Sequence, residues 1–400
     1  MYIPRDMAWQ LAKANAWAQV MVGPRQCGKS TLFSQVTLPG TQEVTFDDLV
    51  LRQLANRDPA LFLQQFNPPL LLDEVQYVPN LFPEIKKLID QRKRATLHSA
   101  VGLPEAIYRL TGSNQIMMDK CIKESLAGRA QYFFLNTLSV HEIMQALPDT
   151  SLSEILFKGG WPELYNNPHL NVITYLNDYI RTYLEKDIAL SAGIEKMQAF
   201  QLVLQLLAAR TGQLGDYTEI AKVAGIQSVT VKEWVGLLTR ADLIYRLPPF
   251  FNNLNKRLIK TPKWYFLDTG IATRLQGWSE EKPLLHSPQA GALFETLVLA
   301  EIVKFIRNTG KSWQLYLWRT KEKEEIDFLI ETEHNCFYAF DAKLGLLGSP
   351  EKVTFPSGFK KQFNPQHPLH LVTFGQQRLK TSNECMSLPL VELFDFLNQL

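Results

Sequence analysis

The chain contains few cysteines, and none of them is paired in the sequence. Its four cysteines lie far apart without a C-x-x-C motif: Cys27, Cys121, Cys336 and Cys385. This spacing argues against a zinc site and against a disulfide framework, and it is typical of proteins from a reducing compartment.

Long apolar runs, a strong net charge and internal repeats are also missing. No segment approaches eighteen consecutive apolar residues, so no transmembrane helix is expected, and residues 1–6 lack the apolar region of a signal peptide. A formal net charge of +2 over 400 residues gives no global attraction to nucleic acid or membrane, so any such binding needs a local patch. These absences predict a soluble, cytoplasmic protein without a membrane partner, and the length predicts two to three domains.

The chain does contain a glycine-rich loop between a strand pattern and a helix pattern. An apolar run (16–22) precedes the motif G-x-x-x-x-G-K-S, and a helix-like stretch (31–36) follows it. Such a loop brings backbone N–H groups close to phosphate oxygens, with the lysine on the β- and γ-phosphates and the serine on Mg²⁺. A chance glycine-rich turn is the alternative, and both flanks argue against it. The expected nucleotide-binding residues are Gly23, Pro24, Arg25, Gln26, Cys27, Gly28, Lys29, Ser30 and Thr31.

Two carboxylates follow the next strong strand pattern. After a strand candidate at 43–46 and one helix predicted over 49–66, the apolar run 70–72 leads into Asp73 and Glu74. In an open parallel sheet the carboxyl ends of the strands face the ligand crevice. Asp73 is therefore expected to hold Mg²⁺ and Glu74 to polarise the attacking water, although such a pair taken alone could be an ordinary strand end.

Three later polar residues are further candidates near the nucleotide. Ser113 or Asn114, after the strand pattern 106–110, could sense the γ-phosphate or position water, and a simple turn is the alternative. Arg129, before the strand pattern 131–135, is a candidate arginine finger or sensor, with a structural arginine as the alternative. A finger that reaches a neighbouring subunit implies a homo-oligomer.

Four motifs in this order resemble one family. They are the loop Gly23–Ser30, Leu72-Asp73-Glu74-Val75-Gln76-x-Val78-Pro79, Leu110–Ser113 and Leu126–Arg129. Together they are similar to a family of bacterial and archaeal AAA-superfamily ATPases whose C-terminal domain, of unknown function, is related to the restriction-endonuclease-like fold. The resemblance covers nearly the whole chain and implies ATP and Mg²⁺ as ligands. Cys27 and Ser30 stand where the family more often has Val and Thr, and the segment 92–105 is longer than usual.

The middle of the chain, predicted to span 151–278, has the outline of a helical, winged-helix module. The predicted elements are helices at 173–188, 198–209, 216–224 and 229–241, with a wing strand at 243–247. The second helix of the helix-turn-helix would enter a DNA groove, or the module would serve only as packing. That helix offers mainly Lys232 and Arg240 as basic residues.

A basic cluster lies just beyond this module. It consists of Lys256, Arg257, Lys260 and Lys263, close to Trp264 and Tyr265. Such a cluster could follow the phosphates of DNA, or it could be a solvated face.

The last part, 279–400, resembles a PD-(D/E)xK nuclease core. A helix from Gly291 is followed by strand patterns at 313–318, 325–330 and 336–341, the last leading into D-x-K. The resemblance implies that Asp327 and Asp341 are metal ligands, Lys343 the catalytic lysine and Glu295 a supporting acid on Mg²⁺. A hairpin with charged ends is the alternative.

The predicted fold is thus α/β, with a P-loop NTPase parallel-sheet domain at 1–150, a winged-helix middle and a restriction-endonuclease-like end. The predicted activity is ATP hydrolysis, with Lys29 and Glu74 as catalytic residues, coupled to DNA engagement or to cleavage by Asp341 and Lys343. The alternative is a nucleotide-gated protein-binding or signalling ATPase with a silent nuclease-like domain.

Overall fold

The structure, a computed structural model, describes residues 2–13, 16–96, 106–113, 118, 125–188, 193–250, 261–345 and 353–400. It divides into two compact units. The N-terminal unit consists of Pro4–Thr137 with Arg307–Thr309, and the C-terminal unit consists of Met1–Ile3, Leu138–Ile306 and Gly310–Leu400. Within the described ranges, no helix is long and apolar enough to cross a membrane.

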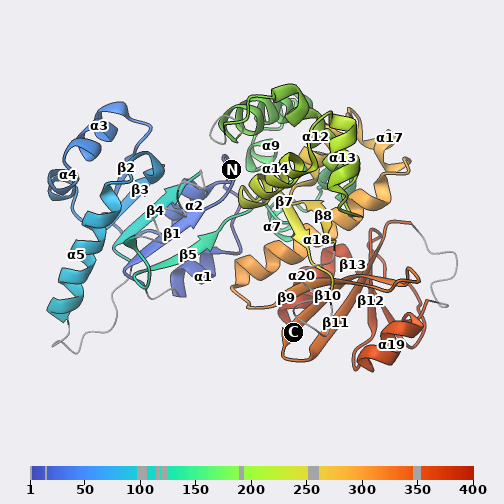
Figure 1. The fold of residues 1–400 in the computed structure, drawn as a ribbon. Coiled ribbons are helices and arrows are strands. Elements are labelled where there is room, and N and C mark those ends of the chain that lie inside the picture. The colour runs from blue at the N-terminus through green and yellow to red at the C-terminus, as the bar shows by residue number, and fades with distance from the viewer. Residues whose placement is uncertain are drawn as a thin grey trace. The chain divides into compact units, whose positions relative to one another are not determined.

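The N-terminal unit is built on a five-stranded parallel sheet of order β2-β3-β4-β1-β5. Its strands are β1 (Ala18–Val22), β2 (Gln42–Thr45), β3 (Leu70–Asp73), β4 (Tyr108–Gly112) and β5 (Ala130–Phe134). The helical elements are α1 (Ala8–Lys13), α2 (Lys29–Val36), α3 (Leu49–Arg57), α4 (Pro59–Gln65), the 3₁₀ turn η1 (Val75–Tyr77) and α5 (Leu81–Thr96). In Figure 1, α3 and α4 lie on the side of β2 and β3. The predicted α/β class with a parallel sheet is confirmed.

Apolar side chains cover both faces of this sheet. Along β1, Val20 belongs to one hydrophobic cluster and Met21 to another, and Leu72 and Leu71 divide in the same way along β3. Successive side chains of a strand point to opposite faces, so both faces are packed and the strands read as continuous apolar runs. Two polar side chains inside the strands, Gln19 of β1 and Arg109 of β4, are buried and hydrogen-bonded to each other. Further polar residues lie at the ends of β3 and β4, at one edge of the sheet.

The single helix predicted over 49–66 is wrong, because the structure has two helices there. Asp58 ends α3 and caps α4, where its carboxylate accepts a hydrogen bond from the Leu61 N–H at 2.9 Å. Pro59 has no N–H group and cannot continue a preceding helix, but it is well suited to the first turn of a new one.

The C-terminal unit begins with a helical region and a small sheet. Its helices are α7 (Val140–Ala146), α8 (Leu152–Lys158), α9 (Pro162–Asn166), α10 (Val172–Tyr179), α12 (Met197–Ala209), α13 (Tyr217–Ala224), α14 (Ser228–Arg240), α16 (Thr269–Leu275) and α17 (Glu281–Leu285). The helix predicted over 173–188 starts as α10 and continues as the π-helix η2 (Ile180–Ile188). The strands β6 (Gln213–Leu214), β7 (Ile244–Leu247) and β8 (Lys263–Phe266) form an antiparallel sheet of order β6-β8-β7.

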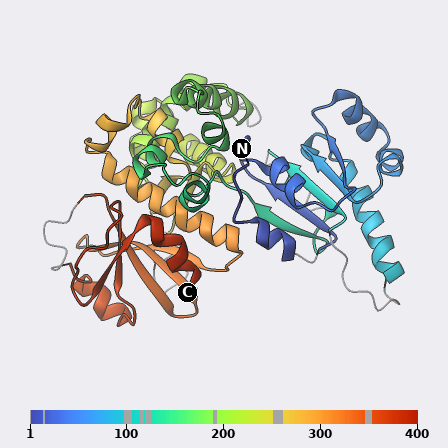
Figure 2. The ribbon, with the colours of Figure 1, turned by 180° about the vertical axis from the view of Figure 1, so that it is seen from behind.

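A second five-stranded sheet completes this unit, with the order β13-β12-β11-β10-β9. The strands β9 (Gln314–Arg319), β10 (Glu325–Glu333) and β11 (Cys336–Lys343) are antiparallel, and β12 (Leu369–Thr373) and β13 (Cys385–Pro389) extend the sheet in parallel. The helical elements are α18 (Ala290–Thr309), α19 (Ser357–Phe363), the 3₁₀ turn η4 (Leu390–Glu392) and α20 (Leu393–Asn398). Figure 2 shows α18, in orange, running along this sheet.

The predicted basic surface cluster is wrong in the part that the structure describes. Lys263, Trp264 and Tyr265 are buried in β8, with exposed fractions of 4%, 2% and 0%. They lie in the strand that joins both neighbours of the small sheet, so they cannot follow DNA phosphates at the surface. The other members, Lys256, Arg257 and Lys260, lie outside the described residues.

Candidate functional site

The loop between β1 and α2 adopts a backbone conformation that requires glycine at two positions. Gly23 has a φ of 152° and Gly28 a φ of 93°, and a Cβ on Gly23 would collide with the carbonyl oxygen of Leu135. Gly28 precedes α2, and no side chain caps this helix. Uncapped N–H groups at the start of a helix form a binding position for an anion.

The charged residue of the loop, Lys29, is folded back over it. Its Nζ donates hydrogen bonds to the carbonyl oxygens of Gly23 at 3.1 Å and Pro24 at 2.8 Å, and the residue is buried. Lys29 therefore supplies a positive charge at the mouth of the loop, at the same place as the N–H groups of α2. Two carbonyl oxygens hold it there. A phosphate oxygen is negatively charged and would therefore bind the ammonium more strongly than these carbonyl oxygens do.

The other loop residues differ in their surroundings. The Arg25 guanidinium donates to the Tyr77 hydroxyl at 3.2 Å, and Gln26 is exposed with a φ of 61°. Cys27 is fully buried, and its thiol donates to a carbonyl oxygen at 3.4 Å. Thr31 is exposed at the third position of α2. The roles of these residues toward a nucleotide stay predictions.

The first predicted carboxylate lies beside this loop. The Ser30 hydroxyl donates to Asp73 Oδ1 at 2.8 Å, and the Thr111 hydroxyl donates to the same oxygen. The sequence pattern had placed Ser30 and Asp73 in one site, and the structure brings their side chains into contact. Thr111 was missed, although it lies at the end of the strand between β3 and β1, where a polar side chain meets the same edge. Hydroxyl and carboxylate oxygens are ligands that Mg²⁺ prefers, so the residues present fit this ion.

The second carboxylate, Glu74, is held by two neighbouring polar side chains. Ser113 donates its hydroxyl to Glu74 Oε2 at 2.8 Å, and the Gln76 amide donates to the same oxygen. Ser113 and Gln76 are almost fully buried, so the carboxylate has a fixed orientation. The prediction for Asn114 lies outside the described residues.

A buried arginine that the sequence analysis did not predict donates hydrogen bonds to the backbone of the glycine loop. Arg5 donates from Nη1 to the Cys27 carbonyl oxygen and from Nη2 to the Asn136 carbonyl oxygen, both at 2.7 Å. Arg5 is 5% exposed. It therefore joins the N-terminal segment to the loop and to the residues after β5.

Arg129 makes a bidentate ion pair with Asp90 on α5. Its Nε and Nη2 donate to the two carboxylate oxygens at 2.7 and 2.9 Å. The hydrogen bond from Arg129 lowers the pKa of Asp90, and the pair raises the pKa of Arg129. This contact is the structural role that the sequence left open, and a role as an arginine finger stays a prediction.

In the C-terminal unit, the predicted acidic set lies on three elements. Glu295 is on α18, Asp327 on β10, and Asp341 and Lys343 on β11. The Asp327 N–H donates to Asp341 Oδ1 at 3.1 Å, and the Ala342 N–H donates to Asp327 Oδ2 at 3.0 Å. Lys343 Nζ lies 3.7 Å from Asp341 Oδ2. The two aspartates and the lysine are therefore brought together as predicted.

A lysine from β8 stands among the acids of this set. Lys263 Nζ lies 2.8 Å from Glu295 Oε1, 2.5 Å from Glu325 Oε1 and 3.8 Å from Asp327 Oδ1. Tyr265, also on β8, donates its hydroxyl to Glu295 Oε1 at 2.5 Å. We call Lys263, Glu295, Glu325 and Asp327 the acidic cluster. The sequence did not predict Glu325 or the position of Lys263.

The charges of this cluster are strongly coupled. Burial and the charge of Asp327 raise the pKa of Glu295 to about 7, and the same two causes raise the pKa of Asp341 to about 6. Burial by itself lowers the pKa of Lys263, but the three carboxylates outweigh burial and raise it above its ordinary value. The surrounding carboxylates therefore favour the charged form of Lys263.

The residues present do not fit a divalent ion at the predicted C-terminal site. Mg²⁺ needs a near-octahedral shell of oxygens, and the Lys263 ammonium already lies 2.8 Å from Glu295 and 3.8 Å from Asp327, two of the three carboxylates that would supply them. Over the ranges that the structure covers, no group of three or more His, Cys, Asp or Glu side chains is arranged to hold a metal ion. The predicted metal role of Glu295, Asp327 and Asp341 disagrees with this arrangement.

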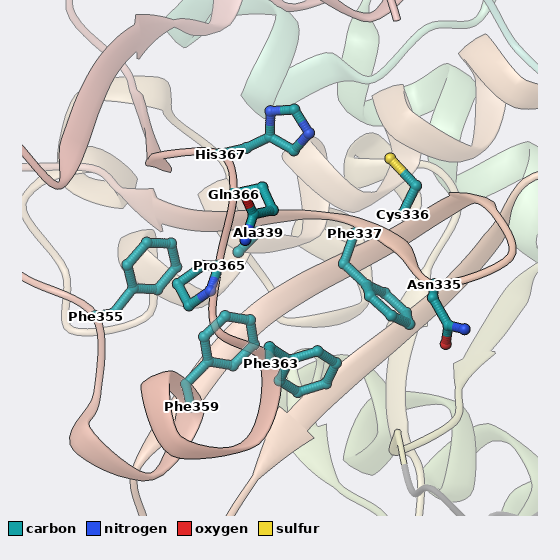
Figure 3. A pocket seen from close by; sticks show the side chains of 10 residues that line it. All are labelled: Asn335, Cys336, Phe337, Ala339, Phe355, Phe359, Phe363, Pro365, Gln366 and His367. Carbon is teal, nitrogen blue, oxygen red and sulfur yellow. The ribbon is translucent and has the colours of Figure 1, made fainter.

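The same unit contains a cavity of about 140 Å³ between β11 and α19 (Figure 3). Aromatic rings line it, with Phe337 from β11, Phe359 and Phe363 from α19, and Phe355 from the segment before that helix. The rings of Phe355 and Phe359 are stacked, with centroids 5.2 Å apart. No pattern in the sequence indicates this cavity.

Three family models match successive parts of the chain. An AAA domain matches residues 16–144, a domain of unknown function (DUF8612) matches 149–282, and another domain of unknown function (DUF4143) matches 290–393. The parallel sheet, the glycine loop at its edge and the adjacent carboxylates agree with the first match. The N-terminal unit is thus a P-loop ATPase domain of the AAA type, a class that binds and hydrolyses ATP.

Relatives of the whole chain occur in bacteria and archaea. The uncharacterized proteins Rv2008c of Mycobacterium tuberculosis and Mb2031c of Mycobacterium bovis are each 30% identical over 345 residues, covering 85% of this chain and 73% of the relative. The uncharacterized protein MJ1637 of Methanocaldococcus jannaschii is 24% identical over 383 residues, covering 85% of this chain and 79% of that protein. The chain belongs to the family of these mycobacterial proteins.

Two solved structures show a weaker likeness. The Walker-type ATPase of Pyrococcus abyssi has a TM-score of 0.41 and 14% identity, covering 68% of this chain and 94% of that protein. The ORC2 protein of Aeropyrum pernix has a TM-score of 0.35 and 12% identity, covering 76% of this chain and 95% of that protein. Scores this low carry no further conclusion.

Proposed function

We propose that this chain hydrolyses ATP at the loop and carboxylates of its N-terminal unit and uses the cycle to control engagement of DNA by its C-terminal unit. The observation that carries the first half is the contact of Ser30 with Asp73 beside the glycine loop. A P-loop serine and a strand-end aspartate are the two protein groups that hold Mg²⁺ in this class of ATPase. Their side chains already touch at 2.8 Å, so they can share one ion with little rearrangement.

Each residue then has a distinct task. Lys29 and the N–H groups at the start of α2 bind the phosphates, and Ser30 with Asp73 would hold Mg²⁺, which neutralises charge on the β- and γ-phosphates when bound. Glu74 accepts a proton from, or orients, the water that attacks the γ-phosphate. Ser113 acts through Glu74: its hydroxyl fixes one carboxylate oxygen and leaves the other directed to water.

The ATPase half is tested with Lys29→Ala, Glu74→Gln and Ser113→Ala, with Ser34→Ala as a matched control. Ser34 is an exposed serine on α2, the helix that also carries Ser30. Lys29→Ala should abolish turnover because the phosphates lose their cation. Glu74→Gln should lower kcat about 10²- to 10⁴-fold, as expected for loss of a general base, with ATP still bound. Retained turnover in Lys29→Ala would overturn the site, and an inactive Ser34→Ala would show a non-specific effect.

The DNA half is supported by the arrangement of the middle elements. The element order α12, β6, α13, α14, β7, β8 with a β6-β8-β7 sheet is the order expected of a winged helix-turn-helix, which supports the proposal. The second of its helices, α14, presents Lys232 and Arg240 as exposed basic residues. A recognition helix contacts DNA through such side chains at its exposed face.

This half is tested by DNA binding of the full chain over a range of salt concentrations. The double variant Lys232→Glu and Arg240→Glu should weaken binding and lower the salt dependence, because phosphate contacts release counterions. Lys282→Glu, an exposed lysine on α17, is the matched control. DNA binding that is unchanged in the double variant would remove α14 from the interface. No DNA binding by the unaltered chain would favour the protein-binding alternative.

DNA cleavage is not part of this proposal. The prediction that Asp341 and Lys343 are catalytic rests on a metal ion among the carboxylates, and Lys263 contacts two of those carboxylates instead. This contact of Lys263 with two carboxylates favours an ATP-driven binding protein over an ATP-driven nuclease. A homo-oligomer with Arg129 in a neighbour's site stays a prediction.

A further inference from the structure

The acidic cluster is built around a buried cation that the chain supplies itself. The Lys263 side chain is 6% exposed, and its ammonium contacts carboxylates from α18 and from β10. An ammonium has three N–H donors, and three carboxylates lie within 3.8 Å of it. The ammonium is therefore within hydrogen-bond distance of Glu295 and Glu325 and is close to the charge of Asp327.

The charges of the cluster and its neighbours nearly cancel. Four carboxylates (Glu295, Glu325, Asp327 and Asp341) face three cationic side chains: Lys263, Lys343, and Arg319, which binds Glu325 at 2.9 Å. At a pH above the raised pKa of Glu295 all four carboxylates are ionised, and four negative charges against three positive ones leave a net charge of −1. A divalent ion added to this set would make it positive, whereas without Lys263 the same set would carry −2, which matches a divalent ion.

The position of Lys263 is fixed by the strand that carries it. Lys263 is paired with Leu247 on β7 and with Leu214 on β6, and the next residues, Trp264 and Tyr265, are buried. Tyr265 donates its hydroxyl to the same oxygen of Glu295 that Lys263 contacts. Two donors from one paired strand thus hold Glu295, and the buried position of the Lys263 side chain keeps its ammonium among the carboxylates.

We propose that Lys263 is the resident cation of the acidic cluster, taking the place that a divalent ion would take, and that the C-terminal unit therefore works as a metal-independent binding module. Replacing Lys263 by a neutral residue should convert the cluster into a divalent-cation site. This inference is independent of the ATPase site, because it concerns residues of the C-terminal unit only.

The test measures Mn²⁺ binding to the full chain without nucleotide, by the electron paramagnetic resonance signal of free Mn²⁺. All proteins carry Asp73→Asn, which removes the carboxylate at the P-loop. The parent protein and Lys263→Arg should bind no Mn²⁺ at the cluster, because both keep the positive charge. Lys263→Met should bind one equivalent, should melt at a higher temperature in millimolar Mn²⁺, and should lose both effects when Asp327→Asn is added.

Two results would overturn the proposal. One is a parent protein that binds one equivalent of Mn²⁺ and loses it on Asp327→Asn or Asp341→Asn. The other is a folded Lys263→Met, shown by circular dichroism, that binds no Mn²⁺. If Lys263→Met does not fold even with Mn²⁺, the comparison of the parent with its Asp341→Asn variant still decides between a resident lysine and a bound ion.

Discussion

Replacement of Arg5 should weaken both the fold of the N-terminal unit and its hold on ATP. The Arg5 guanidinium is buried and donates at 2.7 Å to two carbonyl oxygens, one of which belongs to Cys27 in the glycine loop. A hydrogen bond from a charged donor contributes about 1.5–3 kcal/mol, so the loss of two at the lower end costs about 3 kcal/mol. Arg5→Met keeps most of the apolar volume and removes the guanidinium, including a longer hydrogen bond to the Thr137 carbonyl oxygen at 3.5 Å.

The assay is urea unfolding of the full chain, followed by a probe in the N-terminal unit. With a slope of about 2 kcal/mol per M urea, a loss of about 3 kcal/mol lowers the midpoint of that unit by about 1.5 M. ATP affinity should fall as well, because the Cys27 carbonyl that Arg5 holds is part of the loop that binds phosphate. Arg5→Lys should recover only part of both effects, since one ammonium cannot reproduce the forked geometry.

An unchanged midpoint together with unchanged ATP affinity in Arg5→Met would refute this reasoning. A lowered midpoint with normal ATP affinity would keep the structural role and reject the link to the loop.

Three further predictions concern single side chains. Burial lowers the pKa of His370 from 6.5 to about 4, so between these pH values the imidazole is protonated in the unfolded chain and neutral in the folded chain. The contribution of His370 to stability should therefore be constant above pH 6.5 and fall by about 3 kcal/mol as the pH drops from 6.5 to 4, and the difference between the unaltered chain and His370→Phe in pH-dependent unfolding should show this fall. Asp268 accepts hydrogen bonds from the Gly160 N–H at 2.9 Å and from Trp161 Nε1 at 3.1 Å, so Asp268→Ala should cost at least about 2 kcal/mol in thermal unfolding, and Asp268→Asn less. Gly23→Ala should abolish binding of a fluorescent ATP analogue because its Cβ collides with backbone, whereas an alanine at Gly40, with no atom near its Cβ, should leave binding intact.

The candidate ATP site could be predicted from sequence because its chemistry is local in the chain. Gly23 to Ser30 are consecutive, and a phosphate-binding loop needs glycines at fixed spacing for backbone reasons alone. Asp73 could be placed beside Ser30 because parallel strands end at one edge of the sheet, and the contact in the structure agrees. Thr111 was open to the same argument, since it stands at the end of a buried strand next to β3.

Residues whose role depends on distant partners could not be found in this way. Arg5 binds the carbonyl oxygen of Asn136, 131 positions away, and Asp268 binds Gly160, 108 positions away. Backbone carbonyl and N–H groups carry no side-chain signature, so nothing in the sequence marks these two partners. The break between α3 and α4 is different, because Asp58-Pro59 is a readable signal for a helix end and a new start.

Lys263 shows that side-chain packing crosses the boundary predicted at 278. The lysine was read with its basic neighbours in sequence, yet β8 carries it into contact with Glu295 on α18 and Glu325 on β10. Phe250, also N-terminal to that boundary, packs its ring against Phe337 of β11 with centroids 5.2 Å apart. Residues from the middle thus supply a cation and an aromatic ring to the core of the last part, and a core that is shared in this way makes one cooperative unit. A change in β8, such as Lys263→Met, should therefore lower the thermal stability of the middle and of the last part together, and separate transitions for the two parts would contradict this view.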